Sequence, residues 1–527
     1  MQEKESIDTI TESTSYQMDQ SPVTPAELNG WYSFGIAAEA YTYVAVGVFY
    51  PIILQSLAAH VGVERSDHSK PCNVDGAYKC DVSIMGIYID TASLVLFATT
   101  ISVILQLFLF TTLGSLADFG SHRKEFLVFF SLTSSIVGFG MIFVVNESLY
   151  WIAFLIYIIS NTFYGASFVF CYAWLPLLTR YSPEVLEAHA NPELSKESKY
   201  LVSDAISNKI SATGFFLAYC SAVVQLFIVV TLVAVMGSGT QWGLPENYPM
   251  QIGIALVCVW QGVVVLGYTN THLKTRPGPP LPENVNVVLF SLKNLYHTLS
   301  NARKQPELFK FLIFWFFYAD AFSTVGASAI LFAQSELGAG NDILITCAII
   351  VPIFAGLGTL LWVKIKSTFH LTTQQVLKTH CLLFCLPPLW GLLGFLTPEN
   401  SFGLQNKYEL PIMGALIGLI IGATQSSSRV LFSELVPAGR EAEFFGLYGK
   451  MTIELICIEI TDKGSAWFGP LMVATVTTLT GEMRWGFLFV LFLFVCTFFV
   501  MSSIDVPKGK KEALQFSRVE KVITRIL

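Results

Sequence analysis

Long apolar segments alternate with short polar ones along almost the whole chain. The apolar segments cover approximately residues 32–54, 88–112, 126–145, 149–175, 211–236 and 250–268, and then 310–333, 343–363, 376–396, 410–432, 460–479 and 485–503. Each is close to the roughly 20 mostly apolar residues that a helix needs to cross a bilayer. The pattern therefore predicts an all-α polytopic membrane protein with twelve transmembrane helices.

Polar stretches divide the chain into five parts. We expect residues 1–30 to be a disordered cytosolic tail, 31–268 an N-terminal six-helix half, 269–309 a cytosolic linker, 310–504 a C-terminal six-helix half, and 505–527 a basic cytosolic tail. The first part lacks the basic and apolar regions of a cleaved signal peptide. Two halves of six helices are typical of duplicated transport folds.

The composition agrees with a membrane location and suggests an orientation. The chain is 53% hydrophobic and 13% charged, whereas soluble proteins carry about 25% charged residues. Lysine and arginine are enriched in cytosolic loops of membrane proteins. Most of the 31 basic residues fall in cytosolic segments if the N-terminus is cytosolic, including those of the linker and the C-terminal tail. We therefore predict that both termini are cytosolic.

Two short stretches in opposite halves, residues 38–44 and 319–325, read almost alike. Each begins with alanine, acid, alanine and an aromatic residue, and each ends with valine. A carboxylate inside a membrane span is costly and usually faces the bundle interior or a wet cavity. The candidate residues for substrate binding or proton coupling in these stretches are Glu39, Tyr43, Asp320 and Thr324. The alternative is that the two acids only form structural hydrogen bonds to neighbouring helices.

The tenth apolar segment ends in a polar run from Gly422 to Arg429. Such a run does not face lipid without a high cost, so we add Gln425 and Arg429 to the candidate substrate site. A guanidinium group can bind a carboxylate through two parallel hydrogen bonds, which suits an amino-acid substrate. The alternative is that Arg429 extends to the cytosolic face or pairs with Glu434.

The loop after the second segment contains Gly114, Leu116 and Asp118, followed by a basic pair that begins at Arg123. This loop resembles the signature loop of the major facilitator superfamily. We expect Gly114 to permit close helix approach, and Asp118 to pair with a basic group and hold a cytosolic gate shut. The gating candidates are Gly114, Asp118, Arg123 and Lys463. The matching loop of the second half, residues 358–366, lacks the acid and looks like a degenerate copy, and the alternative for the first loop is a plain basic cytosolic loop.

Cysteines and histidines give little sign of catalytic or metal chemistry. Cys72 and Cys80 share a polar loop on the far side of the membrane, where we expect a disulfide if the compartment is oxidising; the alternative is two unpaired thiols. No soluble-enzyme motif and no metal-ligand spacing of Cys and His is found. We therefore expect no enzyme activity, no metal and no cofactor.

Four motifs carry a more specific resemblance. They are Gly30-Trp31-Tyr32, residues 425–437, residues 441–448 and residues 459–465. Together they resemble the fungal autophagy-related vacuolar amino-acid effluxer family, a divergent branch of the major facilitator superfamily. The resemblance implies a vacuolar membrane protein that exports leucine and other neutral amino acids after autophagic breakdown, with protons as a further partner if transport is coupled to them. The alternatives are a transporter of another small solute and a receptor or scaffold without transport.

One stretch departs from the pattern of that family. In the family, the motif at residues 441–448 runs directly into the motif at residues 459–465, whereas here the ten residues 449–458 separate them. Ten helical residues advance a helix by roughly 15 Å. Our hypothesis is an alternative exon boundary or a gene-model error, which sequencing of the transcript would test: a dominant message that contains the insert would contradict it.

Overall fold

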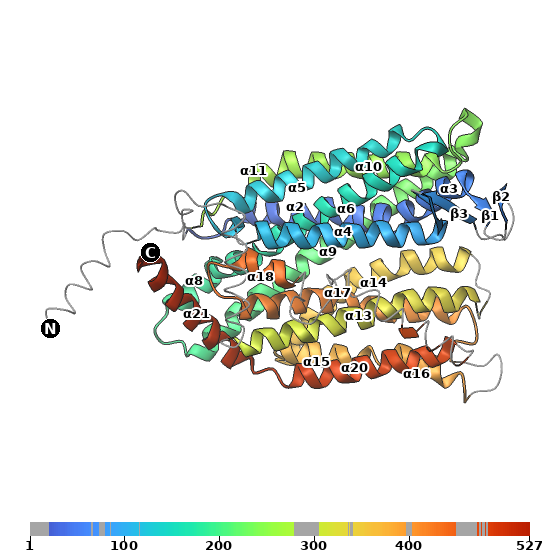
Figure 1. The fold of residues 1–527 in the computed structure, drawn as a ribbon. Coiled ribbons are helices and arrows are strands. Elements are labelled where there is room, and N and C mark those ends of the chain that lie inside the picture. Colours follow the sequence, from blue (N-terminus) through green and yellow to red (C-terminus); the bar gives the residue numbers. More distant parts are fainter. Residues whose placement is uncertain are drawn as a thin grey trace.

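The chain folds into a bundle of long helices that run side by side (Figure 1). The computed structural model describes residues 21–64, 67–72, 80–84, 86–114, 116–278, 305–335, 337, 341–396, 403–448, 472–473, 476, 480 and 483–526. Residues 1–20 of the predicted tail 1–30, most of the linker, the insert at residues 449–458 and the motif at residues 459–465 lie outside these residues. The last residues of that predicted tail are helical instead, because α2 begins at Pro25.

The first half contains six long helical segments. They are α2 (Pro25–Ala40) continued by η1 (Tyr41–Phe49) and α3 (Tyr50–Val61), then α4 (Thr91–Leu113), α5 (His122–Phe139), α6 (Tyr150–Tyr172), α9 (Lys196–Met236) and α10 (Tyr248–Val264). Shorter helices connect or extend them: η2 (Leu116–Asp118), η3 (Gly140–Phe143), η4 (Glu147–Leu149), α7 (Leu175–Arg180), α8 (Pro183–Ala190), η5 (Gly239–Trp242), η6 (Val265–Thr269) and α11 (Asn270–His272).

The second half begins at α13 (Pro306–Ser335) and continues with α14 (Asn341–Thr368), α15 (Thr373–Leu383), α16 (Leu386–Leu393) and α17 (Glu409–Leu435). It ends with α18 (Glu441–Tyr448), η9 (Met483–Trp485), α20 (Gly486–Ser502) and α21 (Val506–Ile526). In the described part of the chain, nine helices are long and apolar enough to cross a membrane, or ten if α20 and the start of α21, which meet at 63°, form one span. The all-helical membrane fold is confirmed. The count of twelve stays a prediction, because the segment at 460–479 lies almost wholly outside the described residues.

Several helices start where the sequence offers a cap. The hydroxyl of Thr24 accepts a hydrogen bond of 3.2 Å from the Glu27 N–H, and Pro25 occupies the first turn of α2, a position where its missing N–H is not needed. The hydroxyls of Ser195 and Thr372 cap α9 and α15 in the same way. α9 begins at Lys196, well before the predicted start at residue 211. The prediction placed the start too late because the first turns of α9 are polar and show no apolar signal.

The first span changes its winding next to a candidate residue. After α2 ends at Ala40, the nine residues of η1 form a π-helix before α-helical winding resumes in α3. π-helical turns are rare and often occur at functional sites. The change begins two residues after Glu39 and includes Tyr43, so these two candidates lie at a local irregularity of the span.

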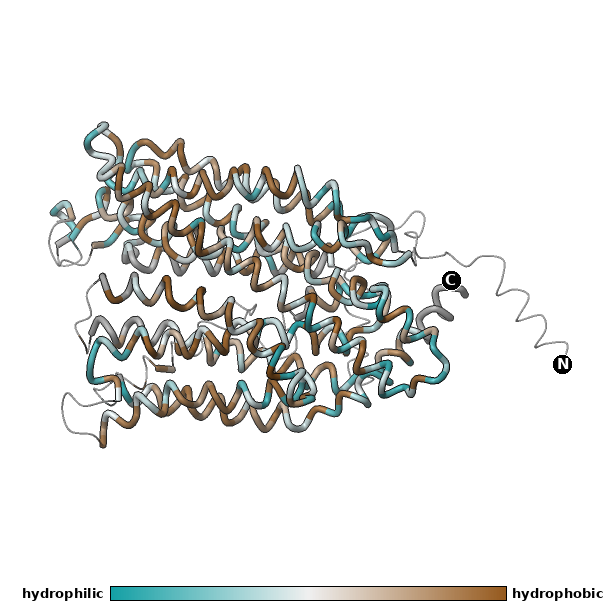
Figure 2. The backbone as a smooth tube through the Cα atoms, turned by 180° about the vertical axis from the view of Figure 1, so that it is seen from behind, coloured by the Kyte–Doolittle hydropathy of each residue, from teal (hydrophilic) through white to brown (hydrophobic). Residues whose placement is uncertain are grey.

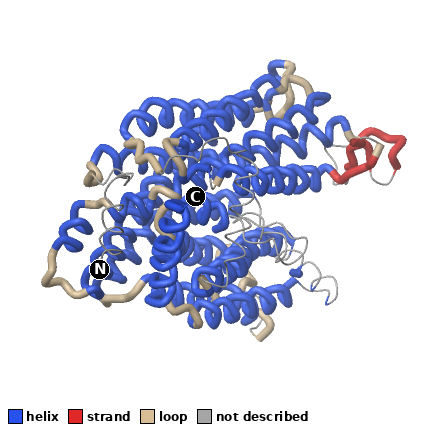
Figure 3. Tube along the Cα trace, turned by 60° about the vertical axis from the view of Figure 1, so that its left-hand side comes forward, coloured by secondary structure: helices blue, strands red, loops and turns tan. Residues whose placement is uncertain are grey.

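A small antiparallel sheet lies at one end of the bundle (Figure 3). Its strands are β1 (Val63–Glu64), β2 (Asp67–Pro71), β3 (Cys80–Ile84) and β4 (Ile87–Asp90), in the order β2-β1-β3-β4. Cys72 and Cys80 are joined in a disulfide, with Cα atoms 5.6 Å apart. The sequence analysis expected an irregular loop here. These strands of two to five residues are too short to show an apolar alternation.

The start of α2 and the helix α21 lie at the opposite end, which we call the terminal end (Figure 1). Hydrophobic residues follow the middle of the bundle, and hydrophilic residues gather toward both ends (Figure 2). The halves meet along two surfaces: α9 packs against α14 and α17, and α18 packs against α4 and α6. The candidates Gln425 and Arg429 lie on α17 at the first surface, and Asp118 lies in η2, which packs against α18 at the second.

Candidate functional site

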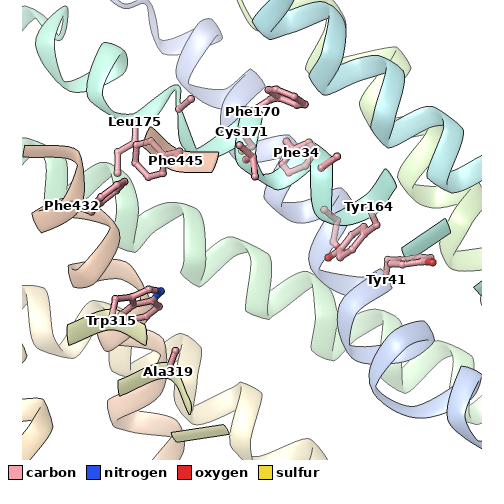
Figure 4. Packing of buried hydrophobic residues seen from close by; sticks show 14 of the residues in the cluster. Phe34, Tyr41, Tyr164, Phe170, Cys171, Leu175, Trp315, Ala319, Phe432 and Phe445 are labelled. Carbon is pink, nitrogen blue, oxygen red and sulfur yellow. The ribbon is translucent and has the colours of Figure 1, made fainter. Parts of the chain in front are cut away.

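A cavity of about 30 Å³ lies where α2, α6 and α9 of the first half meet α17 of the second. Glu39 and Arg429 both line it, so the structure brings together an acid and a base from opposite halves of the chain. The other lining residues are Trp31, Tyr32, Phe34, Gly35, Phe168, Cys171, Tyr172, Gly214, Phe215 and Ala218. Phe34 and Cys171 are shown in Figure 4. The walls are thus aromatic or small, and the two charges stand out among them.

Arg429 is a buried cation held by aromatic rings. Only 5% of the residue is exposed, and its guanidinium carbon lies 4.2, 4.5 and 5.4 Å from the ring centres of Phe215, Tyr172 and Trp31. Cation–π contacts of this kind are stabilising, more so when desolvated. One Nη atom donates a 3.2 Å hydrogen bond to the Ser211 hydroxyl. The rings fix the guanidinium and leave its remaining donors for other partners.

The hydrogen-bonding capacity of Arg429 is not filled. Its Nε atom is buried and has no hydrogen-bond partner among the described residues. The alternative pairing with Glu434 is not observed. Glu434 instead accepts from Lys510 at 3.1 Å and from the Tyr200 hydroxyl at 3.3 Å. A buried charge is costly unless it is paired, so this site favours an anion.

Glu39 belongs to a polar chain that crosses between the halves. Its carboxylate interacts electrostatically with Tyr43 and Tyr219, whose ring centres lie 6.0 Å apart. The Tyr219 hydroxyl donates to the Gln425 side-chain oxygen at 2.8 Å, and Gln425 lies one helical turn before Arg429 on α17. Four predicted site residues, Glu39, Tyr43, Gln425 and Arg429, therefore lie in one region.

The structure does not bring the other two predicted site residues to this cavity. Asp320 and Thr324 are fully buried in α13, and the Thr324 hydroxyl donates to the Asp320 carbonyl oxygen at 2.7 Å. Neither residue is among those that line the cavity. The likeness of the two sequence stretches thus does not produce a symmetric pair of acids in one site.

The gating candidate Asp118 lies in a network at the terminal end. Its carboxylate accepts hydrogen bonds from Arg123 at 2.6 Å and from the backbone N–H groups of Ala442 and Glu443 at 2.8 and 3.0 Å. Arg123 also contacts Glu441 at 3.3 Å. Because α18 begins at Glu441, the carboxylate binds the positive end of a helix from the other half. The network therefore joins the two halves.

Burial and charge act in opposite directions on this network. Burial raises the pKa of the Asp118 carboxyl and the Glu441 carboxylate adds to the rise, whereas Arg123 and the two N–H groups of α18 oppose it. A Cβ atom at Gly114 would lie 3.5 Å from the Ala442 oxygen and 3.6 Å from the Glu443 Cα. Gly114 is therefore in close approach to α18. The fourth gating candidate, Lys463, lies outside the described residues.

A second ion pair joins the halves at the other surface, between α9 and α14. Nζ of Lys366 in α14 lies 2.5 Å from Oδ2 of Asp204 in α9, and it donates to the Thr373 hydroxyl at 2.6 Å. Residues 358–366, which were expected to be a loop and a degenerate copy because they lack an acid, are the last turns of helix α14, and Lys366 takes its acid from the other half. Sequence analysis missed Asp204 because the two residues lie 162 positions apart.

The aromatic residues around Arg429 were only partly foreseen. Trp31 belongs to a motif that carries the family resemblance, whereas Tyr172 and Phe215 lie in apolar segments rich in such residues and show no distinguishing signal. Glu441 stands in a motif but was given no role. Among the residues that the structure describes, no group of three or more His, Cys, Asp or Glu side chains is placed to hold a metal ion.

The fold is shared with transporters of known structure. The structure is similar to that of FucP, a major facilitator superfamily transporter in the outward conformation, with a TM-score of 0.57 and 9% identity over 92% of this chain and 99% of that one. It is also similar to the proton:xylose symporter XylE, with a TM-score of 0.54 and 13% identity over 92% and 96% of the two chains. The predicted major facilitator fold is confirmed.

Sequence relatives narrow the class to a family. Residues 23–514 match the family described as vacuole effluxer Atg22 like. The chain is 31% identical over 580 residues to autophagy-related protein 22-1 of Aspergillus niger, covering 95% of this chain and 91% of the relative. It is 31% identical over 559 residues to autophagy-related protein 22 of Coccidioides immitis, covering 95% and 90%. The chain belongs to the Atg22-like vacuole effluxer family, as its motifs predicted.

Family and fold together define a multi-pass transporter of the vacuolar membrane. Both the family and the fold are those of transporters, which agrees with the expectation that the protein is not an enzyme.

Proposed function

We propose that this protein exports amino acids, leucine and other neutral ones, from the vacuole lumen to the cytosol by alternating access. The observation that carries the proposal is Arg429, a buried cation in an aromatic box that has an unpartnered Nε atom and shares its cavity with Glu39. A zwitterionic amino acid offers one carboxylate and one ammonium group. It would neutralise both charges at once.

Each part of the substrate has a matching group in the cavity. The carboxylate would bind the guanidinium of Arg429 through charge-assisted hydrogen bonds, and the ammonium group would bind the Glu39 carboxylate. The apolar side chain would contact rings such as Phe34 and Phe168. Burial of a side chain of leucine size contributes roughly 1.5–3 kcal/mol. The arrangement thus favours neutral amino acids over inorganic ions.

Contacts between the halves support the assignment of this structure to a conformation that is closed at the terminal end. The Asp118–Arg123 network and the Asp204–Lys366 pair tie the halves together there, and our orientation places this end in the cytosol. A cavity of about 10–15 Å³ holds one water molecule, so the cavity of about 30 Å³ holds only a few and is smaller than leucine. Substrate must therefore enter when the halves separate around Arg429 and Glu39.

Protons could drive the cycle through an acid of the transport path. Glu39 lines the cavity and Asp320 is buried in α13. These two carboxyls are our candidates for proton coupling.

Amino-acid efflux from isolated vacuoles tests the proposal. Vacuoles that lack the protein should release leucine slowly, and the wild-type protein should restore release. A competition panel of amino acids, sugars and drugs against labelled leucine then defines the cargo. Restored flux of another solute class with no effect on amino acids would contradict the proposal. Absence of any flux in vesicles with purified protein would favour a receptor or scaffold.

A further inference from the structure

One wall of the Arg429 cavity lacks projecting side chains. It is formed by Gly35 of α2 and by Gly214 and Ala218 of α9. A Cβ atom added at Gly35 would lie 3.4 Å from the Ala218 Cβ and 3.7 Å from the Gly214 oxygen, which is ordinary van der Waals contact. A methyl group therefore fits at position 35, at the expense of space beside the cavity.

Small residues alone would indicate only close helix packing. Here a second observation points to a ligand. Arg429 lines the same cavity, is 5% exposed, and has a buried Nε atom without a hydrogen-bond partner in the described chain. A ligand that binds this cation would place its remaining atoms against the walls, and this wall is formed by residues with little or no side chain.

We expect the wall to keep its shape when the two halves move. α2 and α9 belong to the same half and pack extensively against each other. The Ser221 hydroxyl of α9 donates to the Ile36 carbonyl oxygen of α2 at 2.7 Å, beside Gly35. Since alternating access moves one half against the other, the distances within this wall are preserved in both forms.

We propose that Gly35, Gly214 and Ala218 form the subsite for the substrate's side chain and set the largest side chain that is transported. This inference rests on the proposed amino-acid export. Gly35 is the position that tests it. A Cβ at Gly214 would come within 2.9 Å of the Trp31 ring, and Trp31 is held by a 2.9 Å hydrogen bond to the Cys171 oxygen and supports Arg429.

The experiment compares leucine and alanine transport by purified protein in vesicles. Gly35→Ala should lower the kcat/KM for leucine while alanine is largely retained, so that the leucine-to-alanine ratio falls. One methylene in a hydrophobic pocket changes discrimination by about 10–200-fold, and we expect a fall of about tenfold or more. Ala218→Gly enlarges the subsite. We expect it to raise the ratio of phenylalanine transport to leucine transport.

Gly262→Ala is the matched control. Gly262 lies in α10, half-buried like Gly35, and a Cβ there would lie 3.6 Å from the Ser135 Cβ, away from the cavity. It should leave the ratio unchanged. An unchanged ratio in Gly35→Ala, with wild-type flux intact, overturns the subsite. Absence of amino-acid flux in the wild-type protein overturns the proposed function instead, so the two failures are distinguishable.

Discussion

Nζ of Lys366 lies 2.5 Å from Oδ2 of Asp204, although the two residues belong to opposite halves of the protein. Both are buried, with 9% and 4% of the residues exposed. The Asp118 network of the first-half loop joins the halves at the other surface, where α18 packs against the first half. The charged contacts that hold the terminal end therefore include these two. In the first, the acid comes from the loop after the second span. In the second, the base comes from α14, next to the corresponding loop.

Removal of Lys366 is expected to open this end. Lys366→Ala leaves the Asp204 carboxylate buried without its cation, and breaking a buried pair in this way costs about 3–5 kcal/mol. A cysteine at Ser426, whose hydroxyl now donates to Ser211 across the halves at 3.0 Å, reports the opening through its rate of reaction with an impermeant maleimide added on the cytosolic side. The rate should rise strongly.

Two variants control this measurement. Lys310→Ala removes a half-exposed lysine that pairs with Glu307 on its own helix, and it should leave the labelling rate unchanged. Replacing the pair by apolar residues, Lys366→Met with Asp204→Leu, should restore slow labelling, because such replacements are often neutral. Equal labelling in Lys366→Ala and Lys310→Ala would show that the pair does not hold the end closed.

The loop before α5 provides a second prediction for the same reporter. Asp118→Ala removes the acceptor of Arg123 and of two N–H groups of α18. Hydrogen bonds to charged groups contribute about 1.5–3 kcal/mol each, so labelling at position 426 should accelerate. Glu125 lies in the same region, but its carboxylate bonds to Ser121 and His122 of its own half. Glu125→Ala should therefore leave the labelling rate unchanged. Acceleration by both variants alike would point to general unfolding of the loop.

Glu39→Gln is expected to weaken substrate binding. The amide keeps the shape of the side chain but loses the charge that would bind the substrate's ammonium group. The loss of a charge-assisted hydrogen bond of about 1.5–3 kcal/mol should raise the KM for leucine efflux from vacuoles, while the protein still reaches the membrane. An unchanged KM, with normal expression, would remove Glu39 from the binding site.

Asp320→Asn should act differently, because Asp320 is fully buried and does not line the cavity. We expect a lower maximal rate of efflux with little change in the KM for leucine. The two constants are obtained from the dependence of initial flux on lumenal leucine concentration. A large rise in KM with an unchanged maximal rate would instead place Asp320 at the substrate.

The sequence predicted the helices well where the membrane dictates the composition. Backbone groups in lipid must be satisfied internally, so each span is an apolar helix. Outside the membrane this constraint ends, and the polar start of α9 at Lys196 and the short strands β1–β4 were therefore missed. The same limit applies to α21, which was expected only as a basic tail.

The site was predictable to the extent that charge inside a span is costly. That argument identified Glu39 and Arg429, and the cost of exposing a polar run to lipid added Gln425. The same argument made Asp320 a candidate for the substrate site. The structure shows that Asp320, in α13, does not line the cavity. The partner of Lys366 was not predictable, because no local pattern relates α14 to α9.

The central claim is that Arg429 binds the carboxylate of the substrate. The most direct measurement compares leucine with leucinamide, which lacks the carboxylate charge, as competitors of labelled leucine transport in vesicles with wild-type protein and with Arg429→Gln. We predict that leucine competes far better than leucinamide in the wild-type protein and that this preference is lost in the variant, with Arg429→Lys intermediate. Equal competition by leucinamide in the wild-type protein, or a preference that survives in Arg429→Gln, would contradict the claim.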